Sequence, residues 1–91
     1  MYGDRRIRKV EIVPYSDRNS ALRAFANVTV YDGDLELRHF LIYERPEIEV
    51  ELPSGIESSG NRVPWFPIND ERLLSNIKNA ITREYQKQRQ K

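Results

Sequence analysis

The sequence predicts a small α+β domain, in which an antiparallel β-sheet of about four strands packs against a C-terminal α-helix. Two segments, L-R-A-F-A-N-V-T-V-Y from Leu22 and E-I-E-V-E-L from Glu47, alternate strictly between apolar and polar residues. That period is typical of half-buried strands. The last quarter of the chain instead spaces its apolar residues three and four positions apart, which predicts an amphipathic helix. With 91 residues the chain fits one domain, 1–91, whose thin core favours self-association.

The first expected strand covers residues 7–13. Its alternation is imperfect, β-branched residues are mixed with basic ones, and Pro14 ends it, so a short or edge strand is predicted. The next strand begins at Leu22 and carries small and β-branched side chains on one face. This second strand is the clearest in the sequence, and its apolar face is expected to line the core.

Asp32-Gly33 predicts a type I′ hairpin turn, because both central positions of that turn need positive φ. The returning strand is expected at 35–43. The pairing that the turn implies is Val30 with Leu35, Thr29 with Glu36, Val28 with Leu37, Asn27 with Arg38, Ala26 with His39, Phe25 with Phe40, and Ala24 with Leu41. In this register His39 faces the apolar side, as a core or dimer-interface residue, and Phe25 and Phe40 form a half-exposed aromatic pair.

A third hairpin strand is expected at 47–52, with its glutamates on a solvated face. The polar, glycine-containing stretch at 53–61 is predicted to be a flexible loop. It leads into R-V-P-W-F-P-I-N, which starts at Arg62.

Trp65 and Phe66 stand between two prolines, which disfavour helix in the preceding residues and predict a stiff, extended connector. The two rings should point to opposite sides. One fits above the small Ala24 and Ala26, and the other covers the Phe25–Phe40 side or a partner subunit. A stacking platform for unpaired bases and a P-x-x-P ligand are the functional alternatives. The structural role is favoured, because such platforms present several aromatics among basic residues.

The C-terminal helix is expected at about 70–88. Asn69 is the predicted N-cap, and the acidic residues that follow suit the positive end of the helix dipole. The apolar stripe comprises Leu73, Leu74, Ile77, Ala80, Ile81 and Tyr85. Glu84 falls within this stripe, where pairing with a basic residue is the one role that we can suggest.

Charge is unevenly distributed, although 15 basic and 14 acidic residues leave a net charge of only +1. Residues 1–23 and 69–91 each carry an excess of three positive charges, and the central part is acidic. The near-neutral total excludes a uniformly basic nucleic-acid binder, but the two basic blocks can create local positive fields. The chain has no cysteine, no signal-peptide pattern and no apolar run of membrane-spanning length, so a cytoplasmic location is expected.

Four segments in order resemble the stage V sporulation protein G (SpoVG) family, the septation regulators of bacteria. They are L-R-A-F-A-N-V-T-V at Leu22, the L-P-S that follows I-E-V-E, F-P-I-N at Phe66, and N-I-K-N-A-I-T-R-E-Y at Asn76. The resemblance covers about residues 10–85. It implies a small α+β domain that dimerises partly through strand edges and regulates by binding DNA or RNA through its helical C-terminal region.

Placed on this chain, the resemblance makes the basic residues of the C-terminal helix the candidate nucleic-acid contacts. They are Arg72, Lys78, Arg83, Lys87 and Arg89. At 100° per residue, Arg72, Arg83 and Lys87 share one flank of the helix, and Lys78 and Arg89 lie on the other. Arg5, Arg6, Arg8 and Lys9 extend the surface if the first strand lies nearby. A basic helix flank is also common for solubility and dipole reasons alone, so the resemblance decides between the two interpretations.

The function expected is therefore a homodimeric regulator that contacts nucleic-acid phosphates, without a cofactor, metal or small-molecule substrate. The alternative is a protein-interaction adaptor for septation, cell division or sporulation, using the acidic segment 44–57 or the Phe25–Phe40 face. No enzyme is expected, because the sole histidine is His39 and no nucleophile motif occurs. Asp32, Asp34 and Glu36 form a small acidic cluster, but its spacing lacks the later bidentate glutamate of a calcium loop.

Overall fold

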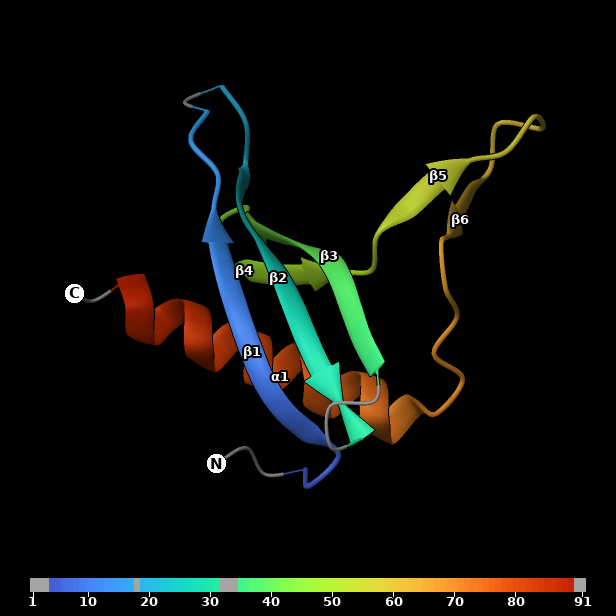
Figure 1. Ribbon diagram of the computed structural model, residues 1–91. Coiled ribbons are helices and arrows are strands. Elements are labelled where there is room, and N and C mark those ends of the chain that lie inside the picture. Colours follow the sequence, from blue (N-terminus) through green and yellow to red (C-terminus); the bar gives the residue numbers. More distant parts are fainter. Residues whose placement is uncertain (1–3, 18, 32–34, 90–91) are drawn as a thin grey trace.

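The computed structural model describes residues 4–17, 19–31 and 35–89 and confirms the α+β class. A four-stranded antiparallel sheet has the order β1-β2-β3-β4, and the helix α1 lies across one of its faces (Figure 1). A separate two-stranded hairpin, β5–β6, projects from the sheet. The elements are β1 (Ile7–Pro14), β2 (Leu22–Val30), β3 (Leu35–Glu44), β4 (Ile48–Glu51), β5 (Ser54–Ile56), β6 (Arg62–Pro64) and α1 (Glu71–Arg89).

The hairpin β5–β6 corrects the predicted loop at 53–61. Ser54, Gly55 and Ile56 form a strand, and they pair with Pro64, Val63 and Arg62 respectively. Strand residues therefore extend on both sides of a shorter turn. The predicted type I′ turn at Asp32-Gly33 lies outside the described residues.

The predicted register of β2 and β3 holds for three residue pairs and then fails at a β-bulge. Val30 lies opposite Leu35, Thr29 opposite Glu36 and Val28 opposite Leu37, as predicted. The register then shifts, so that Ala26 lies opposite Phe40, Phe25 opposite Leu41, and Ala24 opposite Ile42. The predicted pairs Ala26–His39, Phe25–Phe40 and Ala24–Leu41 are wrong.

The bulge also reverses which side chains of β3 enter the core. His39 adopts a φ of 70°, in the left-handed region that an L-residue rarely occupies. Phe40 and Ile42 are consequently fully buried under the helix, whereas His39 is exposed on the opposite face. The prediction of His39 as a residue of the apolar face is wrong for this reason.

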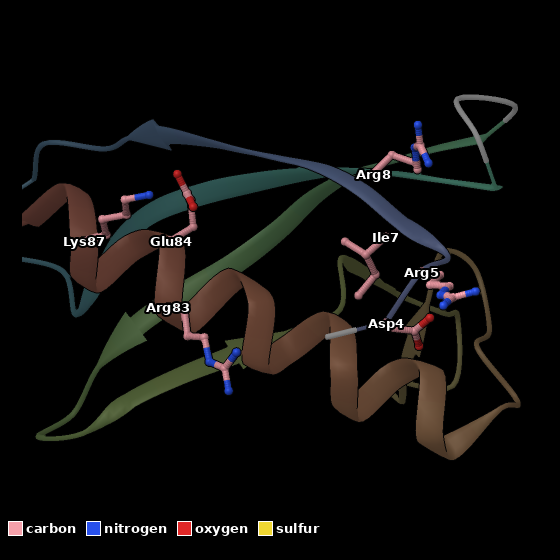
Figure 2. A pocket seen from close by; sticks show the side chains of 7 residues that line it. All are labelled: Asp4, Arg5, Ile7, Arg8, Arg83, Glu84 and Lys87. Atoms are coloured by element: carbon pink, nitrogen blue, oxygen red, sulfur yellow. The ribbon is translucent and has the colours of Figure 1, made fainter. Parts of the chain in front are cut away.

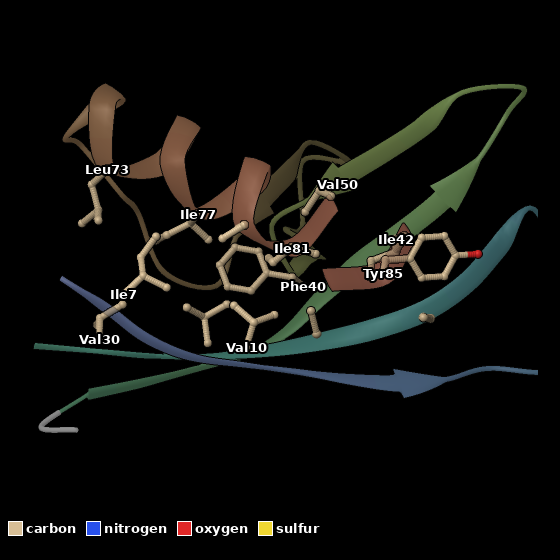
Figure 3. Packing of buried hydrophobic residues seen from close by; sticks show 14 residues of the cluster. Ile7, Val10, Val30, Phe40, Ile42, Val50, Leu73, Ile77, Ile81 and Tyr85 are labelled. Carbon is tan, nitrogen blue, oxygen red and sulfur yellow. The ribbon is translucent and has the colours of Figure 1, made fainter. Parts of the chain in front are cut away.

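The core lies between the sheet and α1 (Figure 3). Ala24 and Ala26 are small and fully covered, which leaves space for the ring of Phe40. This ring meets Phe66 edge to face, with centroids 5.9 Å apart. The buried hydrophobic residues are Ile7, Val10, Ala24, Ala26, Val28, Val30, Phe40, Ile42, Val50, Leu73, Ile77, Ala80, Ile81 and Tyr85.

The two rings of the connector separate as the sequence predicts. Phe66 is the one that packs against the core, and Trp65 remains 65% exposed.

The helix begins one residue later than predicted, because Asp70 rather than Asn69 is the N-cap. The Asp70 Oδ1 atom accepts a hydrogen bond from the Leu73 N–H at 3.0 Å. Along the described parts of the chain, no helix is long and apolar enough to cross a membrane.

Candidate nucleic-acid interface

A groove of about 820 Å³ separates β1 and the segment before it from α1 (Figure 2). Ile7 lies between the two walls and is buried. Of the seven described residues that line the groove, four are basic and two are acidic. The lining residues are Asp4, Arg5, Ile7, Arg8, Arg83, Glu84 and Lys87.

β1 reaches α1 because its own register is irregular. The pairing with β2 shifts between Ile7 and Lys9, so Ile7 and Val10 both face the core although they are three residues apart. This irregularity accounts for the imperfect alternation of the segment. The intervening Arg8 and Lys9 are consequently exposed, and Arg8 borders the groove.

Asp4 fastens the segment before β1 to the start of the helix. Its two carboxylate oxygens accept hydrogen bonds from Arg6 Nε at 3.0 Å and Arg6 Nη2 at 2.8 Å, and Asn76 Nδ2 donates to Oδ2 at 2.9 Å. Arg6 Nη1 in turn donates to Asp70 Oδ2 at 2.9 Å. The Asp4–Arg6 pair therefore joins the segment before β1 to the helix body through Asp4 and to the helix cap through Arg6.

This network shifts the pKa of the groups that form it. The hydrogen bonds from Arg6 and then Asn76 hold the pKa of Asp4 well below its usual range. Hydrogen bonds to Asp4 and Asp70 raise the pKa of Arg6. Asp4 is thus ionised and paired with Arg6, and Glu84 adds a second acidic side chain beside the four basic residues of the groove.

Arg83 and Lys87 are the two predicted contact residues that the structure brings together at the groove. Both are exposed. Lys87 and Glu84 extend toward β1, and Arg83 projects from the outer rim (Figure 2). Arg72 is exposed in the first turn of α1 and is not among the residues that line the groove.

Lys78 and Arg89 occupy the opposite flank of α1, as the helical angles predict. Lys78 is half-buried. Arg89 forms an ion pair with Glu44 Oε1 at 2.8 Å, and its guanidinium carbon lies 5.8 Å from the centroid of the Tyr85 ring. The positive charge of Arg89 is therefore offset by the carboxylate of Glu44, at the end of β3.

Glu44 also accepts a hydrogen bond from the Tyr85 hydroxyl. That bond, followed by the contact with Arg89, lowers the pKa of Glu44. Burial, followed by the same hydrogen bond, raises the pKa of Tyr85. These contacts anchor the last turns of α1 to the end of β3, which gives Arg89 a structural role in addition to its predicted one.

The groove includes residues that the sequence placed there only conditionally. Arg5 and Arg8 were expected to extend the basic surface if the first strand lay near the helix, and the packing of Ile7 meets that condition. Glu84, whose role the sequence did not explain, lines the same groove. Of the acidic cluster around the β2–β3 turn, Glu36 pairs with Arg38 at 2.8 Å, and Asp32 and Asp34 lie outside the described residues.

Comparisons with known protein families, with curated proteins and with solved structures find no match to this chain.

Proposed function

We propose that the chain is a bacterial regulatory protein that binds DNA or RNA, as the resemblance to the SpoVG family implies, and that the groove between β1 and α1 contacts the phosphates. The observation that carries this proposal is that Arg5 and Arg8, from one end of the chain, and Arg83 and Lys87, from the other, line one groove. Arginine and lysine neutralise phosphates and release condensed counterions. Two basic blocks that are far apart in a nearly neutral sequence thereby form one local positive surface.

A homodimer would double these contacts, and the sheet offers two edges for pairing, β1 and β4. Pairing through β4 fits the proposal better. It leaves the groove beside β1 open in both copies. Light scattering on the purified protein at micromolar concentration tests this: a dimer mass is expected, and a monomer mass contradicts the doubled-contact argument. A cytoplasmic location is part of the same proposal.

The adaptor alternative finds less support. Its Phe25–Phe40 surface does not form, because Phe40 is buried on the helix side. In its acidic segment, Arg45 pairs with Glu49 at 2.9 Å and with Glu51 at 3.0 Å. Arg45 offsets one of the five negative charges of this segment and Arg89 offsets a second, at Glu44, so its acidic surface is partly neutralised.

The test is a salt titration of binding to labelled duplex and single-stranded DNA. We expect Arg83→Gln/Lys87→Gln to flatten the slope of log K against log salt by about 1.8 for a duplex, at about 0.9 per phosphate contact. Glutamine preserves helix propensity, so the helix should persist.

The matched control is Lys78→Gln/Arg89→Gln, which removes the same charge from the same helix on the other flank. We expect a smaller change in slope, because Lys78 is half-buried and Arg89 already contacts Glu44. Equal changes in the two variants would show that net charge, and not the groove, determines binding. No binding at low salt would contradict nucleic-acid binding itself.

A further inference from the structure

A second recess lies on the face of the sheet opposite α1, at the base of the β5–β6 hairpin. We call it the outer-face pocket; it is lined by Phe25, His39, Leu41, Pro53, Ser54 and Trp65. Its volume is about 230 Å³. Drug-sized ligands occupy roughly 300–1,000 Å³, so this pocket suits a single flat ring system.

Trp65 is held in place although the residue is 65% exposed. Its backbone N–H donates to the Pro53 carbonyl at 2.9 Å, and prolines flank the Trp65-Phe66 pair. The indole also lies against Gly55, where a Cβ atom would come within 3.0 Å of Nε1. An exposed aromatic ring that is fixed in this way offers a rigid stacking surface at low entropic cost.

His39 reaches the pocket because of the β3 bulge. Its φ of 70° turns it out of the core, and its backbone N–H donates to Asn27 Oδ1 at 3.1 Å. Its ring meets Phe25 edge to face at 6.3 Å, and Phe25 meets Tyr15 at 5.7 Å. Strained backbone and bulges cluster at functional sites. Here the bulge adds an imidazole, which can donate and accept hydrogen bonds, to a row of aromatic rings.

A basic residue borders the pocket. Arg62 Nη1 lies 3.4 Å from Ser54 Oγ, which places a guanidinium beside the lining. Glu51, the β4 partner of Leu41, shares Arg45 with Glu49, at 3.0 and 2.9 Å, so one positive charge offsets one of these two negative charges. The pocket therefore combines a flat apolar surface, a polar ring edge and a cation.

We propose that the outer-face pocket binds an unpaired nucleobase of a single-stranded nucleic acid, stacked on Trp65, with Arg62 beside the adjoining phosphate. Bases in a duplex are already stacked and paired, so this pocket selects unpaired strands. A proline-rich peptide also packs on tryptophan, but it has no phosphate to match Arg62. The inference rests on the proposed nucleic-acid binding and extends it to a separate surface.

Trp65 is the sole tryptophan, so its fluorescence reports on this pocket alone. The full chain is titrated with a fluorescently labelled single strand and, separately, with the same strand as a duplex, and binding is followed by anisotropy. We expect saturable quenching of Trp65 by the single strand and little quenching by the duplex. Trp65→Ala should weaken single-strand binding roughly 5- to 150-fold, the range for losing one stacked base, and leave duplex binding nearly unchanged.

Trp65→Phe retains a smaller stacking surface and should lose less affinity than Trp65→Ala. Circular dichroism of both variants controls for folding. Unchanged single-strand affinity in Trp65→Ala, or quenching by a proline-rich peptide but not by the oligonucleotide, would overturn the inference.

The two proposals fail separately. If Arg83→Gln/Lys87→Gln weakens binding and Trp65→Ala does not, the groove is supported and the pocket inference is overturned. If Trp65 is quenched by the single strand and the groove variant binds as well as the native chain, the pocket is supported and the proposed role of the groove is overturned.

Discussion

At the scale of single residues, Asp4 joins parts of the chain that are far apart in sequence. Through Arg6 and Asn76 it connects the start of β1 to α1, and Arg6 continues the connection to the helix cap at Asp70. The side chain of Asp4 is only 7% exposed. A largely covered carboxylate that accepts several hydrogen bonds stabilises the fold, whereas losing its charge weakens the bonds from those donors.

Asp4→Asn should therefore lower the free energy of unfolding at neutral pH by about 1.5–3 kcal/mol, the range for hydrogen bonds to charged groups. Because folding depresses the pKa of Asp4, its stabilising contribution is present above the unfolded-state pKa of about 3.9 and is lost as the pH falls below it. The difference between the native chain and Asp4→Asn should thus shrink below about pH 4. Urea unfolding at several pH values measures this.

The control is Asp17→Asn, the same chemical change at an exposed carboxylate between β1 and β2 that accepts one backbone hydrogen bond, from the Asn19 N–H at 3.0 Å. It should shift the stability at neutral pH by less than about 1 kcal/mol. A difference between Asp4→Asn and the native chain that stays constant down to acid pH would contradict the assigned role of the Asp4 charge.

At the scale of elements, the sequence predicts the four strands of the main sheet and the helix, but neither the β5–β6 hairpin nor the bulge in β3. Alternation in β2 defines its buried face without ambiguity. In β3 the run F-L-I-Y from Phe40 is apolar throughout, so either phase of the strand buries a hydrophobic residue. The one-residue shift is then decided by the fit of Phe40 against Phe66 and the helix, which is a tertiary contact.

The site divides in the same way. The spacing of Arg83 and Lys87 on one flank of α1 follows directly from helical periodicity. That they line the same groove as Arg5 and Arg8 depends on the packing of Ile7. That Arg89 forms an ion pair with Glu44 depends on where β3 ends. The local sequence pattern predicts which residues share a face of a helix or strand. Which residues of other elements lie against that face is decided by tertiary packing.

The bulge itself gives a prediction about β3. His39 occupies the left-handed region, where glycine is unstrained and β-branched residues are strongly disfavoured. His39→Gly should leave the free energy of unfolding within about 1 kcal/mol of the native value, because relief of strain offsets the lost ring contact with Phe25. His39→Val should cost more than about 1 kcal/mol. Equal stabilities of the two variants, measured by urea unfolding, would argue against the positive φ.

At the scale of the whole molecule, the groove and the outer-face pocket use different surfaces of one small body. α1 covers one face of the sheet (Figure 1) and forms a wall of the groove. The outer-face pocket is lined by residues of the other face and of the β5–β6 hairpin region. The principal extents of the molecule are 36 × 34 × 19 Å. A single strand that contacts both sites must therefore pass around the edge of the sheet.

That geometry predicts a dependence on oligonucleotide length. Among the described residues, none lines both the groove and the outer-face pocket. A long strand that contacts both should therefore show additive losses of binding free energy when Trp65→Ala is combined with Arg83→Gln/Lys87→Gln. A strand too short to reach around the sheet occupies one site at a time, and the second contact adds nothing. We expect additivity to appear only above a threshold length, measured by anisotropy with a series of labelled single strands. If even the shortest strand that binds shows complete additivity, the prediction is wrong. Such a strand could not span from one face of the sheet to the other, so the two contacts would have to lie closer together than the fold allows.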